Sequence, residues 1–336
     1  MRSITVNGEP TDAGAPRSRL HELLRAGTFV VTAELQTTDG GDTAAVHAAA
    51  DSLAGRVDAV NCTDNSSAHP HISPLAAAKL LADRGVEPIV QFTCRDRNRL
   101  ALQADMLGAH ALGARNIVCM TGDDVTAGDH PEAKPIYDLD SLHLVRLARI
   151  LRDEGTYLSG RPLSSPPTFL IGAVENPFAP PVDFRPIRLE KKIEAGAEFF
   201  QTQICFNVDR MREFMRSVVD SGAAEKAWVL AGVYVPRSGR AASYLRDWVP
   251  GIDVPDDVVR RLEGVPADRQ EEEGVRIAVE LCEEIRRMPG VAGLHLMSIK
   301  GDHAIVRVVE ELGLLPRPAA GSSAAAQPPT APASVP

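Results

Sequence analysis

The chain has 336 residues, of which 44% are hydrophobic and 24% charged, so it can bury a large core within one or two domains. Its formal net charge of −9 and its aromatic content of 4% exclude the basic, base-stacking surface that is typical of nucleic-acid binding. The sequence has no apolar run of about eighteen residues and no secretory signal, so we expect a cytoplasmic protein without a membrane segment.

The first residues, 1–16, are polar and contain Gly and Pro, which predicts a flexible arm. Eight nearly continuous apolar runs follow, as expected of strands buried on both faces: 29–35, 57–63, 87–94, 115–121, 168–174, 198–206, 227–235 and 293–299. A segment of helical periodicity follows each of them, and several of these segments end at Gly, a common helix stop: 42–54, 73–85, 97–113, 141–155, 185–196, 208–222, 268–288 and 302–313. The Ala/Pro/Ser-rich residues 317–336 predict a disordered tail.

Eight strand–helix units within residues 17–316 predict an α/β fold, a single-domain (β/α)8 TIM barrel. A doubly wound open sheet is the alternative, because it has the same alternation of strands and helices. The first strand–helix turn, LQTTDGGD, contains no G-x-G-x-x-G motif, so the sequence gives no support for a Rossmann site.

Polar residues stand at the carboxyl end of almost every predicted strand, which is where barrels carry their functional groups. A convergent ring of such side chains predicts a binding or catalytic site, although some of them will serve as helix caps or in loop ion pairs. The candidates, in chain order, are Glu34, Thr63, Gln91, Thr93, Thr121, Gly122, Asp123, Glu175, Gln203 and Ser238.

Two acidic residues are the candidates for proton transfer. Glu34 ends an otherwise apolar strand, so it is either an ion-paired edge residue or a general acid whose carboxyl is kept protonated by burial. Asp123 lies in the turn TGDD after the fourth strand. A carboxylate-only Mg²⁺ site is the rival use of these acids, but no H-x-x-x-H spacing occurs and we expect no metal.

The five cysteines are odd in number and form no C-x-x-C pair, which argues against a disulfide framework and against a zinc site. We expect reduced, small buried residues of the strands.

Several longer motifs resemble the methylenetetrahydrofolate reductase family over residues 28–315. The most specific is FTCRDRNRLALQADMLGAHALGARNIVCMTGD (92–123), and EKKIEAGAEFFQTQICFN (190–207) is similar to a second family block. VPGIDVPD (249–256) and LHLMS in the last strand also fit. The resemblance implies a TIM barrel that reduces 5,10-methylenetetrahydrofolate to 5-methyltetrahydrofolate with NAD(P)H and noncovalent FAD, in a family whose barrels often form homo-oligomers.

The resemblance also implies roles for the candidate residues. Glu34 is then the acid that protonates N10 and opens the five-membered ring of the folate, and Asp123 lies beside the flavin and the pterin. The substrate contacts come from Gln203 and Ser238. The cofactor contacts come from Thr63, Gln91, Thr93, Thr121, Gly122, Glu175, Arg185, Arg188 and Lys192.

The chain departs from the family pattern at three places. Thr37 and Thr38 replace two prolines, Gln91 replaces a histidine, and Arg185 and Arg188 replace an Asp and an Asn. The arginines fit a bidentate grip on the FAD diphosphate, and equally fit a flavin-free reductase that passes hydride directly from NADH. A folate-dependent methyltransferase or demethylase on the same barrel, or a non-catalytic folate binder, is the further alternative.

Overall fold

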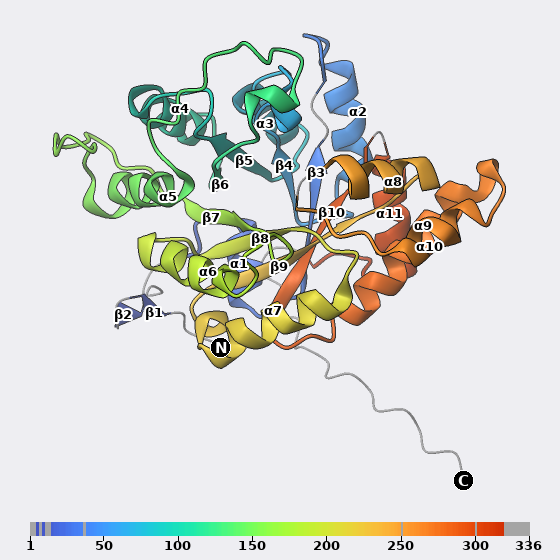
Figure 1. Ribbon diagram of the computed structural model, residues 1–336. Helices are drawn as coiled ribbons and strands as arrows, with labels where there is room; N and C mark the ends of the chain where they lie inside the picture. Colours follow the sequence, from blue (N-terminus) through green and yellow to red (C-terminus); the bar gives the residue numbers. More distant parts are fainter. Residues whose placement is uncertain are drawn as a thin grey trace.

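The computed structural model describes residues 5–6, 9–10, 15–35, 38–249, 251–299 and 301–318. Eight parallel strands form a closed barrel in the order β10-β3-β4-β5-β6-β7-β8-β9, and helices surround it (Figure 1). This arrangement confirms the predicted (β/α)8 barrel, and the alternative of an open doubly wound sheet is wrong. Of the predicted flexible arm, Thr5–Val6 and Glu9–Pro10 pair as the two short antiparallel strands β1 and β2. The remainder of 1–14 and the predicted tail from residue 319 onward lie outside the described residues.

All eight predicted strands are confirmed, and each observed strand end lies within two residues of its predicted position. The barrel strands are β3 (Val30–Leu35), β4 (Ala59–Cys62), β5 (Pro88–Thr93), β6 (Asn116–Met120), β7 (Leu170–Glu175), β8 (Phe199–Ile204), β9 (Trp228–Tyr234) and β10 (Val291–Met297).

A helix follows every barrel strand, as the periodicity predicted. These are α2 (Ala44–Leu53), α3 (Pro74–Ala82), α4 (Arg99–Ala111), α5 (Ser141–Arg149), α6 (Phe184–Ala195), α7 (Val208–Asp220), α10 (Gln270–Ile285) and α11 (Asp302–Glu311). Three further α-helices of the described residues were not predicted: α1 (Arg19–Arg25) before the barrel, and α8 (Gly239–Trp248) and α9 (Asp256–Glu263) in the long connection after β9.

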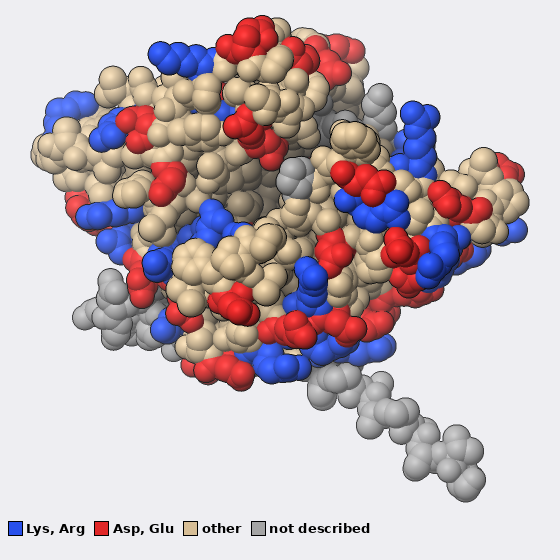
Figure 2. Space-filling model, in the orientation of Figure 1, with Lys and Arg blue, Asp and Glu red and all other residues tan. Residues whose placement is uncertain are grey.

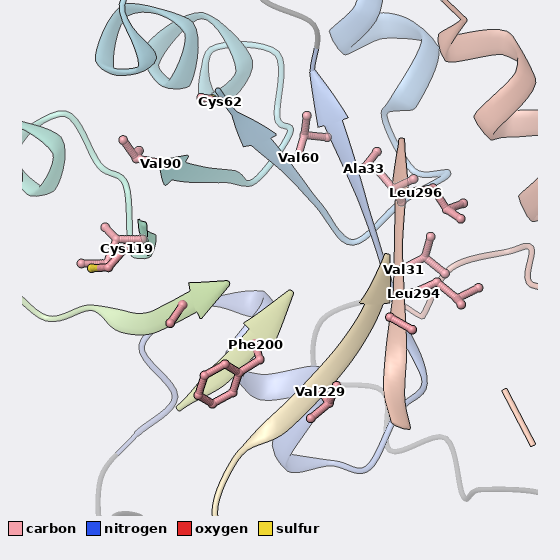
Figure 3. Close-up of a cluster of buried hydrophobic side chains, with 14 of the residues drawn as sticks. Val31, Ala33, Val60, Cys62, Val90, Cys119, Phe200, Val229, Leu294 and Leu296 are labelled. Carbon is pink, nitrogen blue, oxygen red and sulfur yellow. The ribbon is translucent and has the colours of Figure 1, made fainter. Parts of the chain in front are cut away.

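The outward-facing strand residues form the main core between the barrel and its helices. Val31 and Ala33 of β3 and Leu294 and Leu296 of β10 are fully buried in this cluster, and Figure 3 shows their side chains pointing away from the barrel interior. Because side chains alternate along a strand, the residues between them face inward. The alternation therefore assigns Thr32, Glu34 and their counterparts on the other strands to the inside of the barrel.

The amino-terminal end of the barrel interior is apolar and closed by α1. Leu20, Leu23 and Leu24 of this helix form one buried cluster with inward residues of seven strands, including Phe199 and Leu230. Ser18 caps the helix by accepting a hydrogen bond from the backbone N–H of His21 at 3.0 Å. Ligands can therefore enter the interior only from the opposite end, where the strands finish.

Phe199 fills this closed end only because a glycine faces it. A Cβ built on Gly172 of β7 would lie 2.4 Å from the Phe199 ring. We expect Gly172→Ala to lower the free energy of unfolding by about 1–3 kcal/mol, the usual cost of overpacking a core. Urea denaturation measures this loss, and Gly172→Ala combined with Phe199→Leu should recover part of it. A Gly172→Ala variant as stable as the parent would contradict the close contact.

The predicted boundary between barrel and tail at residue 316 leaves out two residues that contact the barrel. Arg317 Nη2 lies 2.5 Å from Asp58 Oδ2, and the two side chains are 4% and 0% exposed. Arg317 also donates to the carbonyl oxygen of Phe29 at 2.9 Å, and Arg19 donates to that of Pro318 at 2.7 Å. The chain is thus held at the closed end of the barrel up to residue 318.

The cysteines and the helix lengths bear on two expectations, that the chain has no disulfide framework and no membrane segment. All five cysteines are free and buried, as predicted, although Cys282 lies in α10 rather than in a strand. Burial raises the pKa of Cys94 to about 12, and it raises the pKa of each of the other four thiols as well. Within the described ranges, no helix is both long enough and apolar enough to span a bilayer.

Candidate active site

The candidate site lies inside the barrel, above the apolar closed end. Figure 2 shows a hollow in the face formed by the carboxyl ends of the strands, with Lys and Arg on the side of α6 and Asp and Glu on the opposite side. Inward residues at this level are polar on four strands: Thr32, Asn61, Gln201 and His295. The interior thus changes from apolar to polar along the barrel axis, and the polar half faces the opening.

Glu34 stands at the upper edge of this polar layer. Its side chain is 30% exposed, so it reaches the opening while its neighbours are buried. Gln91 of β5 donates from Nε2 to Glu34 Oε2 at 3.4 Å, and His295 Nε2 lies 3.7 Å from the same oxygen. Two of the family-derived candidates, Glu34 and Gln91, are therefore brought together, and both neighbours of Glu34 face only one of its two oxygens.

Below Glu34, four buried side chains form one hydrogen-bonded network. The side-chain amides of Asn61 and Gln201 form two reciprocal hydrogen bonds across the barrel, of 2.6 and 2.9 Å. Gln201 Nε2 also lies 3.2 Å from Thr32 Oγ1 and 3.3 Å from His295 Nδ1, and Thr32 Oγ1 lies 3.0 Å from that nitrogen. Buried polar groups are costly unless they are paired, and here each one has partners. The network therefore fixes the orientation of the His295 ring.

His295 is a site residue that the sequence reasoning did not single out. It lies in LHLMS, where the apolar run indicates a strand but does not say which side chains point inward. In the structure His295 is in register with Thr32 in the β10–β3 pair. A polar residue within a strand buried on both faces was the available signal.

Three cations and one acid gather at the carboxyl end of β7 and on α6. Lys192 donates from Nζ to Glu175 Oε2 at 2.9 Å and to the carbonyl oxygen of Val174 at 2.5 Å. Burial lowers the pKa of Lys192, and the neighbouring Glu175 carboxylate opposes that shift. Arg185 lies 3.8 Å from Glu175, but its Nε and Nη2 donate to carbonyl oxygens of residues 179 and 180 at 2.7 and 2.8 Å.

Arg188, on the same helix, is half-buried, and no hydrogen bond or ion pair joins its side chain to another described residue. Glu175 offsets one of the three positive charges, so the cluster keeps an excess of positive charge. An excess of this kind suits the diphosphate that FAD and NAD(P)H share. The residues present therefore fit a dinucleotide, with Arg188 as the cation whose donors are not already used.

Asp123 lies in the loop after β6, which is hydrogen-bonded to the loops after β4 and β5. Its Oδ2 accepts from the backbone N–H of Ser67 at 3.0 Å, and its carbonyl oxygen accepts from Arg95 Nη1 at 3.2 Å. The Arg95 side chain is buried and also donates to the carbonyl oxygen of Asn65 at 3.0 Å. Arg95 thus holds together the loops that follow β4, β5 and β6, and Asp123 is exposed at their surface.

The threonines and the glycine that were predicted to contact the cofactor lie where the strands end and these loops start. Thr93 donates to Asp64 Oδ2 from its backbone N–H at 2.7 Å and from its hydroxyl at 2.9 Å. Gly122 has a φ of +92°, and a Cβ there would lie 3.1 Å from Thr93, so glycine is required for the turn. Burial raises the pKa of Asp64, although Arg97 and Thr93 oppose this shift. Thr63 is buried next to Asp64, and Thr121 is half-buried next to Gly122.

Of the two predicted substrate contacts, Gln203 lies in β8 and Ser238 lies in the connection after β9, and no described hydrogen bond joins either of them to Glu34. Gln203 of β8 is half-buried, and its Oε1 accepts from the backbone N–H of Ile204 at 2.9 Å. Ser238 caps α8 by accepting from Ala241 N at 3.1 Å. Ser238 also lines a cavity of about 510 Å³ with Tyr234, Arg237 and Ile299. A second cavity, of about 520 Å³, lies at the closed end beside Asp58 and Arg317.

No cluster of three His, Cys, Asp or Glu side chains placed to hold a metal ion occurs among the described residues. Of the acids of the mouth, Glu175 pairs with Lys192, Asp123 accepts from the backbone N–H of Ser67, and Glu34 accepts from the Gln91 amide. The carboxylate-only Mg²⁺ site that the sequence left open therefore gains no support from their arrangement.

The closed parallel barrel defines a (β/α)8 barrel protein, and the polar side chains at the carboxyl ends of its strands make that face the candidate ligand site. The family model of methylenetetrahydrofolate reductase matches residues 19–313, which is nearly the whole barrel. The chain therefore belongs to the methylenetetrahydrofolate reductase family, and the resemblance noted in the sequence is confirmed.

Curated relatives support the same assignment. The chain is 23% identical over 245 residues to a probable methylenetetrahydrofolate reductase (NADPH) of Caenorhabditis elegans, and 25% identical over 251 residues to methylenetetrahydrofolate reductase 1 of Schizosaccharomyces pombe. The alignments cover 71% and 73% of this chain but only 34% and 38% of those proteins. The chain thus spans little more than a third of the length of the curated relatives it matches.

A solved structure from Clostridium thermocellum, described as an uncharacterized protein that binds two copies of 5-methyl-5,6,7,8-tetrahydrofolic acid, has the same fold. The TM-score is 0.60 at 14% sequence identity, and the match covers 88% of this chain and 99% of that one. At this identity the likeness shows the barrel architecture alone.

Proposed function

We propose that this barrel reduces 5,10-methylenetetrahydrofolate to 5-methyltetrahydrofolate with NAD(P)H as the source of hydride. The observation that carries the proposal is Glu34: a carboxyl group at the inner rim of the mouth, 30% exposed, with its Oε2 faced by two side chains. Membership in the family supports the same reaction.

The chemistry assigned to Glu34 is the donation of one proton. Protonation of N10 breaks the bond between N10 and the bridging methylene carbon and leaves an iminium on N5. A hydride then adds to that carbon, so one NAD(P)H and one proton are consumed for each methyl group formed. A general acid at this position contributes about 10²–10⁴ in rate.

The cation cluster at α6 supports a dinucleotide beside the folate. FAD, when bound, would supply hydride transfer between NAD(P)H and the folate. The residues that would hold its diphosphate, or that of the nicotinamide nucleotide, are Arg188 and Lys192, with Arg185 and Glu175 setting the local charge.

Oxidation of NADH or NADPH by the purified protein, followed at 340 nm with and without 5,10-methylenetetrahydrofolate, tests the proposed reaction. Turnover that requires the folate supports it and excludes both the methyltransferase and the non-catalytic binder. The absence of folate-dependent oxidation with either nucleotide, with and without added FAD, contradicts it. A visible spectrum of the same sample, recorded after FAD addition and removal of the excess, separates a flavoprotein from a flavin-free reductase.

The charge of Arg188 should strengthen dinucleotide binding. We expect Arg188→Ala to raise the dissociation constant of the dinucleotide about 10- to 150-fold, because one charge-assisted hydrogen bond contributes about 1.5–3 kcal/mol. Titration calorimetry with FAD and with NADH measures it. Arg216→Ala is the matched control, since Arg216 is exposed on the neighbouring helix α7. If the Arg188 variant and the parent bound FAD and NADH with equal affinities, the proposal that this cluster binds the diphosphate would be contradicted.

A further inference from the structure

We propose that His295 is a positioning residue for Glu34: its neutral ring holds Glu34 Oε2 so that the transferable proton resides on Oε1, which faces the mouth. This inference rests on the proposed function of Glu34 as the acid, and it adds a second residue and a defined proton position to it.

The ring is buried and held from two sides. His295 is 3% exposed and lies in register with Thr32 on the neighbouring strand. Its Nδ1 has two close polar neighbours, Thr32 Oγ1 at 3.0 Å and Gln201 Nε2 at 3.3 Å. The only titratable side chain found within ion-pair distance of the ring in the described structure is Glu34.

The network selects the tautomer. In the orientation that the structure shows, Gln201 turns Nε2, an amide nitrogen that can only donate, toward His295 Nδ1, and its Oε1 accepts from Asn61 Nδ2 at 2.6 Å. A proton on His295 Nδ1 would face the hydrogens of that amide. We therefore assign Nδ1 as the acceptor, and the neutral ring then carries its proton on Nε2, 3.7 Å from Glu34 Oε2.

Gln91 donates to the same oxygen from the other side, at 3.4 Å. The Gln91 contact is a long hydrogen bond, and the His295 contact, at 3.7 Å, is a close approach beyond hydrogen-bond range. Catalytic contacts of this kind tighten when a substrate binds. Glu34 Oε1 has no hydrogen-bond partner among the described residues. Since Gln91 and His295 both face Oε2, we assign the hydrogen of a protonated Glu34 to Oε1, the oxygen left for an incoming folate.

The first measurement is the tautomer of His295, from the ring ¹⁵N chemical shifts of the full-length protein at pH 7.5. His295→Gln identifies the signal by its loss. A neutral ring protonated on Nε2 is expected. A ring protonated on Nδ1, or a charged ring, overturns the inference. This measurement does not depend on turnover, so it tests the tautomer that the inference requires even if the proposed reduction is not observed.

The second measurement separates positioning from general structural support. We expect His295→Leu to lower kcat about 10²-fold, the effect of misplacing a reacting group by about 1 Å. Its dissociation constant for 5-methyltetrahydrofolate should stay within about threefold of the parent, since ground-state binding is unaffected. His295→Gln should recover most of the loss, because its amide can donate to Glu34.

The control for the histidine substitutions is His143→Gln, an exposed position on α5, which should leave both constants unchanged. An unchanged kcat in His295→Leu overturns the inference. So does a loss of kcat that His295→Gln fails to recover, because it indicates packing rather than hydrogen bonding. If His295→Leu does not fold, the His295→Gln variant and the tautomer decide.

Discussion

Glu34→Gln is expected to lower kcat for folate-dependent NAD(P)H oxidation by about 10²–10⁴ while the affinity for 5-methyltetrahydrofolate stays close to that of the parent. Glutamine keeps the size of the side chain and can still accept hydrogen bonds from Gln91 and His295 on its remaining oxygen. It has no acidic proton to give to N10, so ring opening loses its catalyst. Steady-state kinetics and equilibrium fluorescence titration measure the two quantities.

The matched control for this substitution is Glu225→Gln, an exposed glutamate after α7, whose replacement should change neither constant. If Glu34→Gln turned over as fast as the parent, Glu34 would not be the acid. If it lost folate affinity in proportion to rate, Glu34 would bind the substrate rather than protonate it.

Arg317→Met is expected to lower the free energy of unfolding by about 3 kcal/mol. The substitution leaves the fully buried Asp58 carboxylate without its closest cation, and breaking a buried pair from one side costs about 3–5 kcal/mol. The backbone N–H of Val31, which donates to Asp58 Oδ2 at 2.8 Å, and the more distant Arg19 remain. The lower end of that range therefore applies, and urea denaturation followed by circular dichroism measures it.

Arg19→Met provides the comparison, because Arg19 contacts the same carboxylate at 3.3 Å with a side chain that is 28% exposed. We expect a loss of about 1 kcal/mol, as for a partly solvated pair. If the two variants lost equal stability, or if Arg317→Met lost none, the chain after residue 316 would not contribute to the barrel as the buried pair indicates.

The eight strands and their following helices were predictable because long apolar runs and helical periodicity are strong local signals. The helix α1 was missed because seven residues with one apolar face, placed after a polar arm, resemble a loop. Helices α8 and α9 were missed because they belong to one long connection, in which only the final helix has extended periodicity. The start of the tail was misjudged at Arg317, whose partner Asp58 is 259 residues away.

The site was only partly predictable, for a related reason. Strand ends identified Glu34 and Gln91, and the structure places them 3.4 Å apart. The polar network beneath them joins β3, β4, β8 and β10, with separations of 140 and 263 residues between Asn61 and Gln201 and between Thr32 and His295. Strands buried on both faces carry no alternation to show which side chains point inward. Their inward set follows only from the closed register of the barrel.

The closed end of the barrel has a practical consequence for experiments that need the protein held in one orientation. Arg19 and Pro318, joined by a 2.7 Å hydrogen bond, mark where both ends of the described chain leave the barrel, on the side opposite Glu34. Affinity tags or sensor-surface couplings placed at either terminus should therefore leave the mouth facing bulk solution. An immobilised sample prepared in this way should bind folates and dinucleotides with the same constants as the free protein.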